Sequence, residues 1–217
     1  MLLNELSAGA AVNLDMIKDS KVYEVSTVVV GVSSEMNNSV LLEPFEYKGN
    51  ILDLGNKAFD GVTFRLYADD LNGARVGWMG IDVKLTEYNG HKYYAVTAPT
   101  FGSVSHQTDR RDHARVSVGL KGVLTFPDID EKYKVEVCDI SANGISFACD
   151  RDFDMINKPC HIRFAENVNK TSYELDVECQ CVRENEESGR YFYGCRVNEQ
   201  SRRGLTYIYI KKIMSKH

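Results

Sequence analysis

Long apolar runs are missing from this sequence of 217 residues, and none approaches the roughly 20 residues that a membrane-spanning helix needs. The opening segment, MLLNELSAGAAV, has no basic region, includes Glu5 and lacks a long apolar core, so it does not resemble a secretory signal. We therefore expect a cytoplasmic protein that does not insert into a membrane.

Basic side chains are not in excess. Lys and Arg number 26 against 31 Asp and Glu, for a formal net charge of -5. The residues through Ser105 include 8 basic and 13 acidic side chains, and 18 of each follow. Neither half has the broad positive surface of a protein that binds nucleic acid through phosphates, so we expect no DNA or RNA partner. Any anion-binding site must therefore be a small cluster of basic side chains.

Catalytic motifs are also lacking. The sequence has no glycine-rich phosphate loop with Lys-Ser/Thr and no His-x-x-x-His pair, and its five histidines are scattered. We expect a protein that is not an enzyme and has no cofactor. Among enzymes, a flavin-binding split barrel in the first half is the nearest alternative.

Cysteines form no Cys-x-x-Cys pair, and all six lie at or after Cys138. Cys179 and Cys181 have the spacing of neighbours on one face of a strand. In a cytoplasmic protein this pattern favours reduced, buried thiols over disulfides or zinc ligands, so we expect no metal site.

Alternation of apolar and polar residues with period two predominates, and it predicts half-buried antiparallel strands. Asn89-Gly90 lies between two such runs and predicts a hairpin turn. We predict a mainly β fold of two small antiparallel β-barrels, a split-barrel-like domain at 1–104 and a six-stranded barrel with a C-terminal α-helix at 105–217. The predicted strands lie near 21–32, 39–45, 62–68, 77–85, 91–96, 114–126, 133–140, 143–149, 160–164, 173–182 and 191–197.

The one helix expected from periodicity is at 201–216. Its apolar residues, Leu205, Ile208, Tyr209 and Ile213, recur at helical spacing and should pack on the second barrel. Ser201 is the predicted N-cap.

The segment RRDHAR at 110–115 places arginines just before a predicted strand. A guanidinium can donate two parallel hydrogen bonds to a phosphate, or to O6 and N7 of guanine. Arg111 and Arg115 are therefore candidate ligands for a guanine nucleotide. Taken alone, the segment is more typical of a solvated group of charges.

The segment DISANG at 139–144 follows in a predicted turn of the same barrel. Asp139 can accept hydrogen bonds from N1 and N2 of guanine, Ser141 can donate or accept, and Gly144 allows a close approach of the backbone. Taken alone, this segment is a plausible tight turn that needs no ligand.

Together and in this order, Arg-x-x-x-Arg and Asp-x-Ser-x-x-Gly resemble the PilZ domain, a bacterial receptor module for the second messenger cyclic di-GMP. The resemblance extends over about 106–217. It implies that Arg111 and Arg115 contact phosphates and the Hoogsteen edge of guanine, while Asp139, Ser141 and Gly144 contact another face of a guanine. It also implies that Arg110 can stack on a base.

The first half resembles the N-terminal barrel of YcgR-type flagellar brake proteins, through GAAVNL at 9–14 and NILDLGNKAF at 50–59. This resemblance implies a receptor whose domains change arrangement on binding cyclic di-GMP. It would regulate motility, or envelope, exopolysaccharide and biofilm functions, through a protein partner such as the flagellar motor or stator at the basal body. The alternative is a PilZ-like interaction scaffold that binds no nucleotide.

Overall fold

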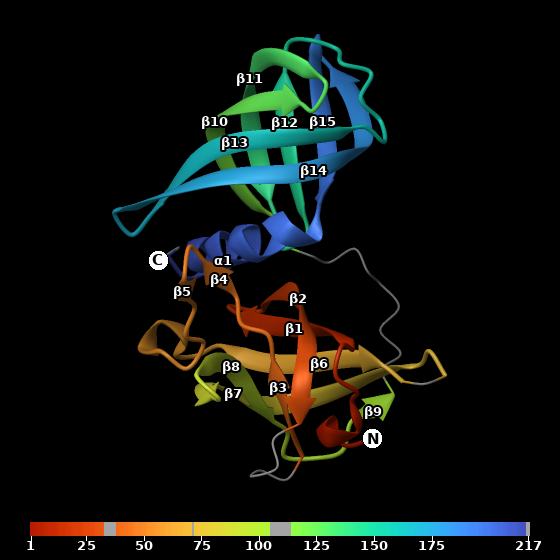
Figure 1. Cartoon of the computed structure of the whole chain (residues 1–217), viewed down its shortest axis with the longest axis vertical. Helices are drawn as coiled ribbons and strands as arrows, with labels where there is room; N and C mark the ends of the chain where they lie inside the picture. Colours follow the sequence, from red (N-terminus) through yellow and green to blue (C-terminus); the bar gives the residue numbers. More distant parts are fainter. Residues whose placement is uncertain (33–37, 71, 105–113, 216–217) are drawn as a thin grey trace. The chain divides into compact units, whose positions relative to one another are not determined.

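Strands form most of the chain in the computed structural model, which describes residues 1–32, 38–70, 72–104 and 114–215 (Figure 1). This confirms the prediction of a mainly β protein with a C-terminal helix.

Two compact units make up the chain, one of residues 1–45 and 51–114, the other of residues 46–50 and 115–217. The domain boundary predicted after residue 104 stays a prediction, because 105–113 lie outside the described residues.

The first unit is a ring of antiparallel strands. Its order is β6-β1-β2-β3-β8-β7, and β6 also pairs with β7, so the sheet closes on itself, while β9 adds to β7. Trp78 is 1% exposed and lies in the interior of this unit. The elements are η1 (Leu3–Glu5), β1 (Ala11–Lys18), β2 (Lys21–Val32), β3 (Ser39–Leu42), η2 (Lys57–Phe59), β6 (Thr63–Asp69), β7 (Arg75–Tyr88), β8 (His91–Thr97) and β9 (Ser103–Val104).

The turn between β7 and β8 has the predicted conformation. Asn89 and Gly90 have φ angles of 52° and 77°, and Tyr88 pairs with His91 on either side of them. Both turn residues lie in the left-handed region that Asn and Gly tolerate best, which confirms the predicted hairpin.

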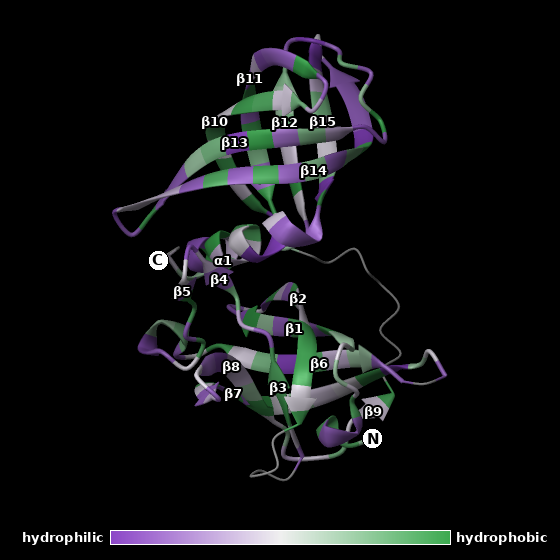
Figure 2. Ribbon diagram, viewed as in Figure 1, coloured by the Kyte–Doolittle hydropathy of each residue, from purple (hydrophilic) through white to green (hydrophobic). Residues whose placement is uncertain are grey.

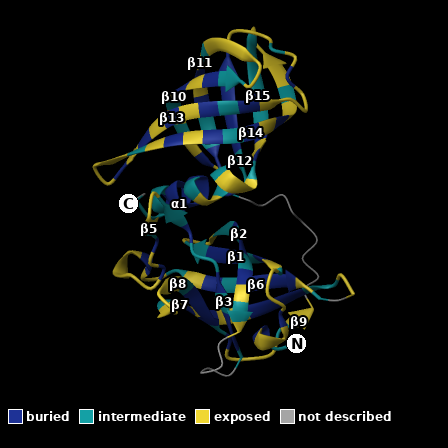
Figure 3. Ribbon diagram, viewed as in Figure 1, coloured by how far each residue is buried: buried dark blue, intermediate teal, exposed yellow. Residues whose placement is uncertain are grey.

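The second unit contains a closed barrel of order β10-β11-β12-β15-β14-β13. Apolar side chains alternate with polar ones along its strands, and buried positions alternate with exposed ones (Figures 2 and 3). This pattern follows from the two-residue period of a strand, which sends successive side chains to opposite faces. The strands are β10 (Val116–Phe126), β11 (Ile129–Ile140), β12 (Gly144–Cys149), β13 (Pro159–Val168), β14 (Thr171–Glu187) and β15 (Arg190–Val197).

The helix α1 (Glu199–Ser215) packs against β13 and β14 at one end of this barrel (Figure 1). Its predicted apolar residues, Leu205, Ile208, Tyr209 and Ile213, are all buried. No helix of the described part of the chain is long and apolar enough to cross a membrane.

The predicted N-cap of α1 is wrong by one turn. Asn198 caps the helix, because its Oδ1 accepts a hydrogen bond from the backbone N–H of Ser201 at 2.9 Å. Ser201 lies within the first turn, and its hydroxyl accepts from the N–H of Glu178 on β14 at 2.9 Å. The Asn198 side chain also donates to the Glu178 carboxylate at 2.6 Å, so both side chains attach the start of α1 to the barrel.

Two more contacts hold parts of this unit together, one between α1 and β13 and one between residues 46–50 and α1. The Lys212 ammonium lies 2.7 Å from the carboxylate of Glu166, whose side chain is 3% exposed. Residues 46–50, with β4 (Glu46–Tyr47) and the start of β5 (Asn50–Ile51), group with this unit. There the Tyr47 ring stacks on that of Tyr207 with centroids 5.9 Å apart.

Candidate functional site

The described residues of the two motifs meet at one edge of the barrel. Arg115 directly precedes β10, Asp139 is the next-to-last residue of β11, and Gly144 is the first residue of β12. Ser141 lies in the turn between these two strands. Arg110 and Arg111 lie outside the described residues, so their predicted roles stay predictions.

Arg115 and Asp139 form an ion pair across the two motifs. The Nη1 of Arg115 donates to the Oδ1 of Asp139 at 3.3 Å, and the two side chains are 53% and 26% exposed. A surface pair of this kind contributes only about 0 to 1 kcal/mol to stability. The pair therefore positions both groups at the surface and leaves them available to a competing ligand.

The turn between β11 and β12 is closed by its own backbone. The N–H of Ser141 donates to the carbonyl of Gly144 at 2.9 Å, and the Ser141 hydroxyl donates to the same oxygen at 3.4 Å. A Cβ on Gly144 would lie 3.0 Å from the carbonyl oxygen of Cys195 on β15. Glycine is thus favoured here, because β12 and β15 approach each other so closely that a Cβ would need its neighbours to shift.

Strand register adds residues to this face that the sequence alone did not indicate. Asp139 pairs with Ser146, Ser146 pairs with Gly194, and Gly194 pairs with Arg183. Because paired residues of antiparallel strands point to the same face, these four positions form one row across β11, β12, β15 and β14. The missing side chain at Gly194 leaves room for Arg183, whose Nε lies 3.4 Å from the place of a Cβ there.

A second arginine lies on the same face. Arg196 is exposed and pairs with Gly144, two positions along β15 from Gly194. The described part of this face therefore has three arginines, Arg115, Arg183 and Arg196, of which Arg115 pairs with Asp139, and this set of side chains is suited to an anion. Neither Arg183 nor Arg196 belongs to the Arg-x-x-x-Arg or the Asp-x-Ser-x-x-Gly motif, and the pairing of β14 and β15 with β12 brings them to this face.

Two polar atoms near the turn are buried without a hydrogen-bond partner among the described residues, Oδ1 of Asn143 and Oγ of Ser146. Buried polar atoms are usually paired, so such atoms beside a predicted binding surface are candidates for a ligand contact.

The thiol of Cys138, next to Asp139, is not a charged group of the site. Burial, together with the charges of Glu136 and Asp139, raises its pKa above the ordinary value. The thiol therefore stays protonated near neutral pH and does not add charge to the site.

The second unit also matches a known family. A family model described as PilZ domain matches residues 109–209. The chain contains a PilZ domain. This match includes both motifs, all six barrel strands in full and most of α1, and it confirms the resemblance found in the sequence.

Several solved structures match most of the chain, at low sequence identity and with TM-scores below 0.5. They include the Bacillus subtilis inhibitor of motility MotI/DgrA, at 14% identity, 98% coverage of this chain, 100% of that chain and a TM-score of 0.42. The K. pneumonia MrkH–c-di-GMP complex follows at 13% identity, with 94% and 87% coverage and a TM-score of 0.40. Escherichia coli YcgR in complex with c-di-GMP has 13% identity, 93% and 84% coverage and a TM-score of 0.34. No match is found among proteins with curated functions.

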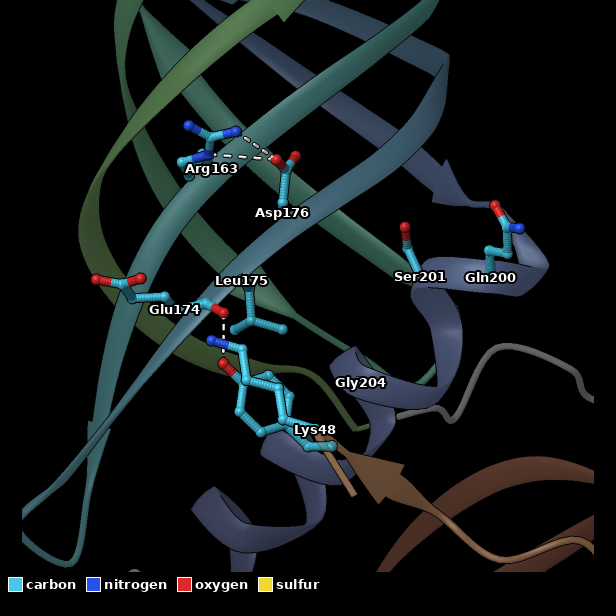
Figure 4. Close-up of a pocket in the computed structure, with 9 residues that line it drawn as sticks. Lys48, Arg163, Glu174, Leu175, Asp176, Gln200, Ser201 and Gly204 are labelled. Atoms are coloured by element: carbon cyan, nitrogen blue, oxygen red, sulfur yellow. Dashed lines mark hydrogen bonds and ion pairs between the residues drawn. The ribbon is translucent and has the colours of Figure 1, made fainter. Parts of the chain in front are cut away.

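A pocket of about 410 Å³ lies elsewhere on the unit that contains the PilZ domain (Figure 4). Its wall includes Arg163 and Asp176, which pair at 2.6 Å, and Tyr47, whose hydroxyl donates to the carbonyl of Glu174. Among the predicted ligand-binding residues that the structure describes, Arg115, Asp139, Ser141 and Gly144, none lines it. The pocket and the two motifs are therefore separate places on this unit.

Proposed function

We propose that this protein is a receptor for cyclic di-GMP, bound at the face formed by Arg115, Asp139, Ser141 and Gly144. The observation that supports this most is the ion pair between Arg115 and Asp139. It brings together two motifs that lie 24 residues apart, in the domain family to which the sequence already pointed.

The ligand offers groups that match the site. Asp139 would accept hydrogen bonds from N1 and N2 of one guanine, and Arg115 would donate to a phosphate or to O6 and N7. Such charge-assisted bonds are about twice as strong as neutral ones. Since the Arg115–Asp139 pair is weak, the ligand gains more from the two side chains than the free protein loses.

Arg111 would supply a second bidentate contact, and Arg110 would stack on a base. Because these residues belong to the segment that joins the predicted domains 1–104 and 105–217, binding would change the arrangement of the domains. The ligand shifts this equilibrium only as far as it binds one arrangement better. We propose that the altered surface acts on a motility partner of the flagellar brake type, or on envelope machinery.

Nucleotide selectivity tests the proposal. We expect cyclic di-GMP to bind the wild-type chain in titration calorimetry, and cyclic di-AMP to bind at least about 100-fold more weakly, because adenine lacks the O6 acceptor and the N1 and N2 donors. Equal affinities for the two dinucleotides would show a general anion site and would reject guanine recognition.

A further inference from the structure

Four of the six cysteines meet inside the barrel. Cys160 on β13, Cys179 and Cys181 on β14 and Cys195 on β15 are between 0% and 4% exposed. The strands are neighbours in the order β15-β14-β13, with Cys160 paired to Cys179 and Cys181 paired to Cys195. Their side chains therefore form two adjacent cross-strand pairs on the inner face of the barrel.

The sulfur atoms of three of them converge. The Sγ atoms of Cys160 and Cys179 are 3.5 Å apart, and those of Cys160, Cys179 and Cys195 all lie within 4.8 Å of one another. None is in a disulfide. Equilateral triangles with sides of 3.5 and 4.8 Å have centres about 2.0 and about 2.8 Å from their corners, which brackets a zinc–sulfur bond of about 2.3 Å.

Cys181 supplies a fourth sulfur beside this triangle. It lies opposite Cys195, and its thiol donates to the carbonyl of Arg183 at 3.4 Å. A rotation of this side chain toward Cys195 would exchange a weak thiol hydrogen bond for a metal bond. Four cysteine thiolates are one of the common ligand sets of a structural zinc site.

We propose that Cys160, Cys179 and Cys195, with Cys181 as the fourth ligand, form a site for a thiophilic ion such as Zn²⁺ inside the barrel. Each thiol that binds loses its proton to solvent, so Zn²⁺ on four thiolates leaves the site with a charge of -2. The ion would cross-link three neighbouring strands, β13, β14 and β15. Because the backbone of Cys195 runs close to Gly144, with its carbonyl oxygen 3.0 Å from the place of a Cβ there, the ion would further stabilise the turn of the proposed nucleotide site.

Ordinary packing of small apolar side chains is the competing explanation. Cys149 is an internal control for it, because it is also buried in the barrel unit but its thiol donates to the carbonyl of Arg151. A packing role predicts that Cys149→Ser and Cys160→Ser behave alike. A metal site predicts that only the second changes metal content.

In the test, the full chain is refolded from denaturant with a reductant and excess Zn²⁺, and free metal is then removed. Bound zinc is measured by inductively coupled plasma mass spectrometry. We expect about one Zn²⁺ per wild-type and Cys149→Ser chain, and loss in Cys160→Ser and Cys195→Ser. Metal should also raise the melting temperature of the wild type by at least about 5 °C.

A second measurement needs only the wild-type chain, so it tests the proposal even if the cysteine variants fail to fold. Wild-type chain refolded with Co²⁺ should show the sulfur-to-cobalt charge-transfer absorption and the visible bands of a tetrahedral thiolate site. Their absence from folded wild type would overturn the proposal, as would a Cys160–Cys179 disulfide found in place of metal. Neither measurement uses cyclic di-GMP, so its result is separate from that of the nucleotide proposal.

Discussion

The guanidinium of Arg115 and the carboxylate of Asp139 pair at 3.3 Å, which joins the segment before β10 to the end of β11. Both groups are therefore placed at one surface before any ligand arrives. Arg163 and Asp176 form a comparable exposed pair on β13 and β14, away from the two motifs, at 2.6 Å. This second pair provides matched controls for substitutions in the first.

Replacing Arg115 with Ala should weaken cyclic di-GMP binding by about 10-fold to over 100-fold, because a bidentate arginine contact contributes about 1 to 3 kcal/mol. Arg163→Ala removes an arginine from a similar exposed ion pair and should leave the affinity within about 2-fold. Titration calorimetry measures both. Equal losses would indicate a general effect of charge and not a contact of Arg115.

Replacing Asp139 with Asn should weaken binding by at least about 10-fold, because the amide presents N–H groups where the carboxylate accepts from guanine N1 and N2. Asp176→Asn is the control, with unchanged affinity expected. An Asp139→Asn chain that binds as tightly as wild type would remove Asp139 from guanine recognition.

Replacing Arg183 with Ala should weaken binding by about 3-fold to 10-fold, less than the loss of Arg115, because Arg183 lies on the far strand of the cross-strand row. Its guanidinium lies beside Gly194 and can reach a phosphate from there. The dependence of affinity on salt should also fall in this variant. An unchanged affinity and salt dependence would limit the site to β10, β11 and β12.

Replacing Gly144 with Ala should destabilise the barrel by about 1 to 3 kcal/mol, because the new Cβ would lie 3.0 Å from the carbonyl of Cys195. Gly31→Ala is the control, since no atom lies within 4 Å of a Cβ there. Urea unfolding followed by circular dichroism measures the change. Trp78 belongs to the first unit, so its fluorescence should report an unchanged transition.

Replacing Lys212 with Met should destabilise the barrel unit by about 3 to 5 kcal/mol, because the buried Glu166 carboxylate loses its charged partner and, within the described part of the chain, keeps only the hydrogen bond from the backbone N–H of Asn167. The double variant Glu166→Leu, Lys212→Met should recover most of this loss. The same urea experiment distinguishes the variants. A double variant no more stable than Lys212→Met would show that the cost comes from packing and not from the unpaired charge.

The sequence predicted most of the strands and the helix, because period-two alternation and the Asn89-Gly90 turn are local properties of the chain. It did not predict β1 (Ala11–Lys18), which pairs with both β2 and β6. The conformation of turns without such a dipeptide was harder to predict from the sequence. Asn169 and Lys170 connect β13 to β14 with φ angles of 50° and 66°, although lysine rarely adopts this conformation. The N-cap was misassigned because Asn198 and Ser201 are both good caps, and only the packing against Glu178 decides between them.

The site was predictable where residues belong to short motifs and not where strand register brings them together. Arg115 and Asp139 were found from spacing and residue type, and the structure pairs them. Arg183 reaches the site through Gly194, and Cys160 reaches Cys195 across β14, by pairings between strands that the sequence alone does not specify. The cysteines were accordingly predicted as reduced, buried thiols and not as metal ligands.

Titration calorimetry with cyclic di-GMP on the wild-type chain and on Arg111→Ala tests the central claim most directly. We expect saturable binding to the wild type, with a stoichiometry of one or two ligands per chain, and near-complete loss of heat in the variant. Equal heats from both proteins, or none from folded wild type, would contradict the proposed receptor and favour an interaction scaffold that binds no nucleotide.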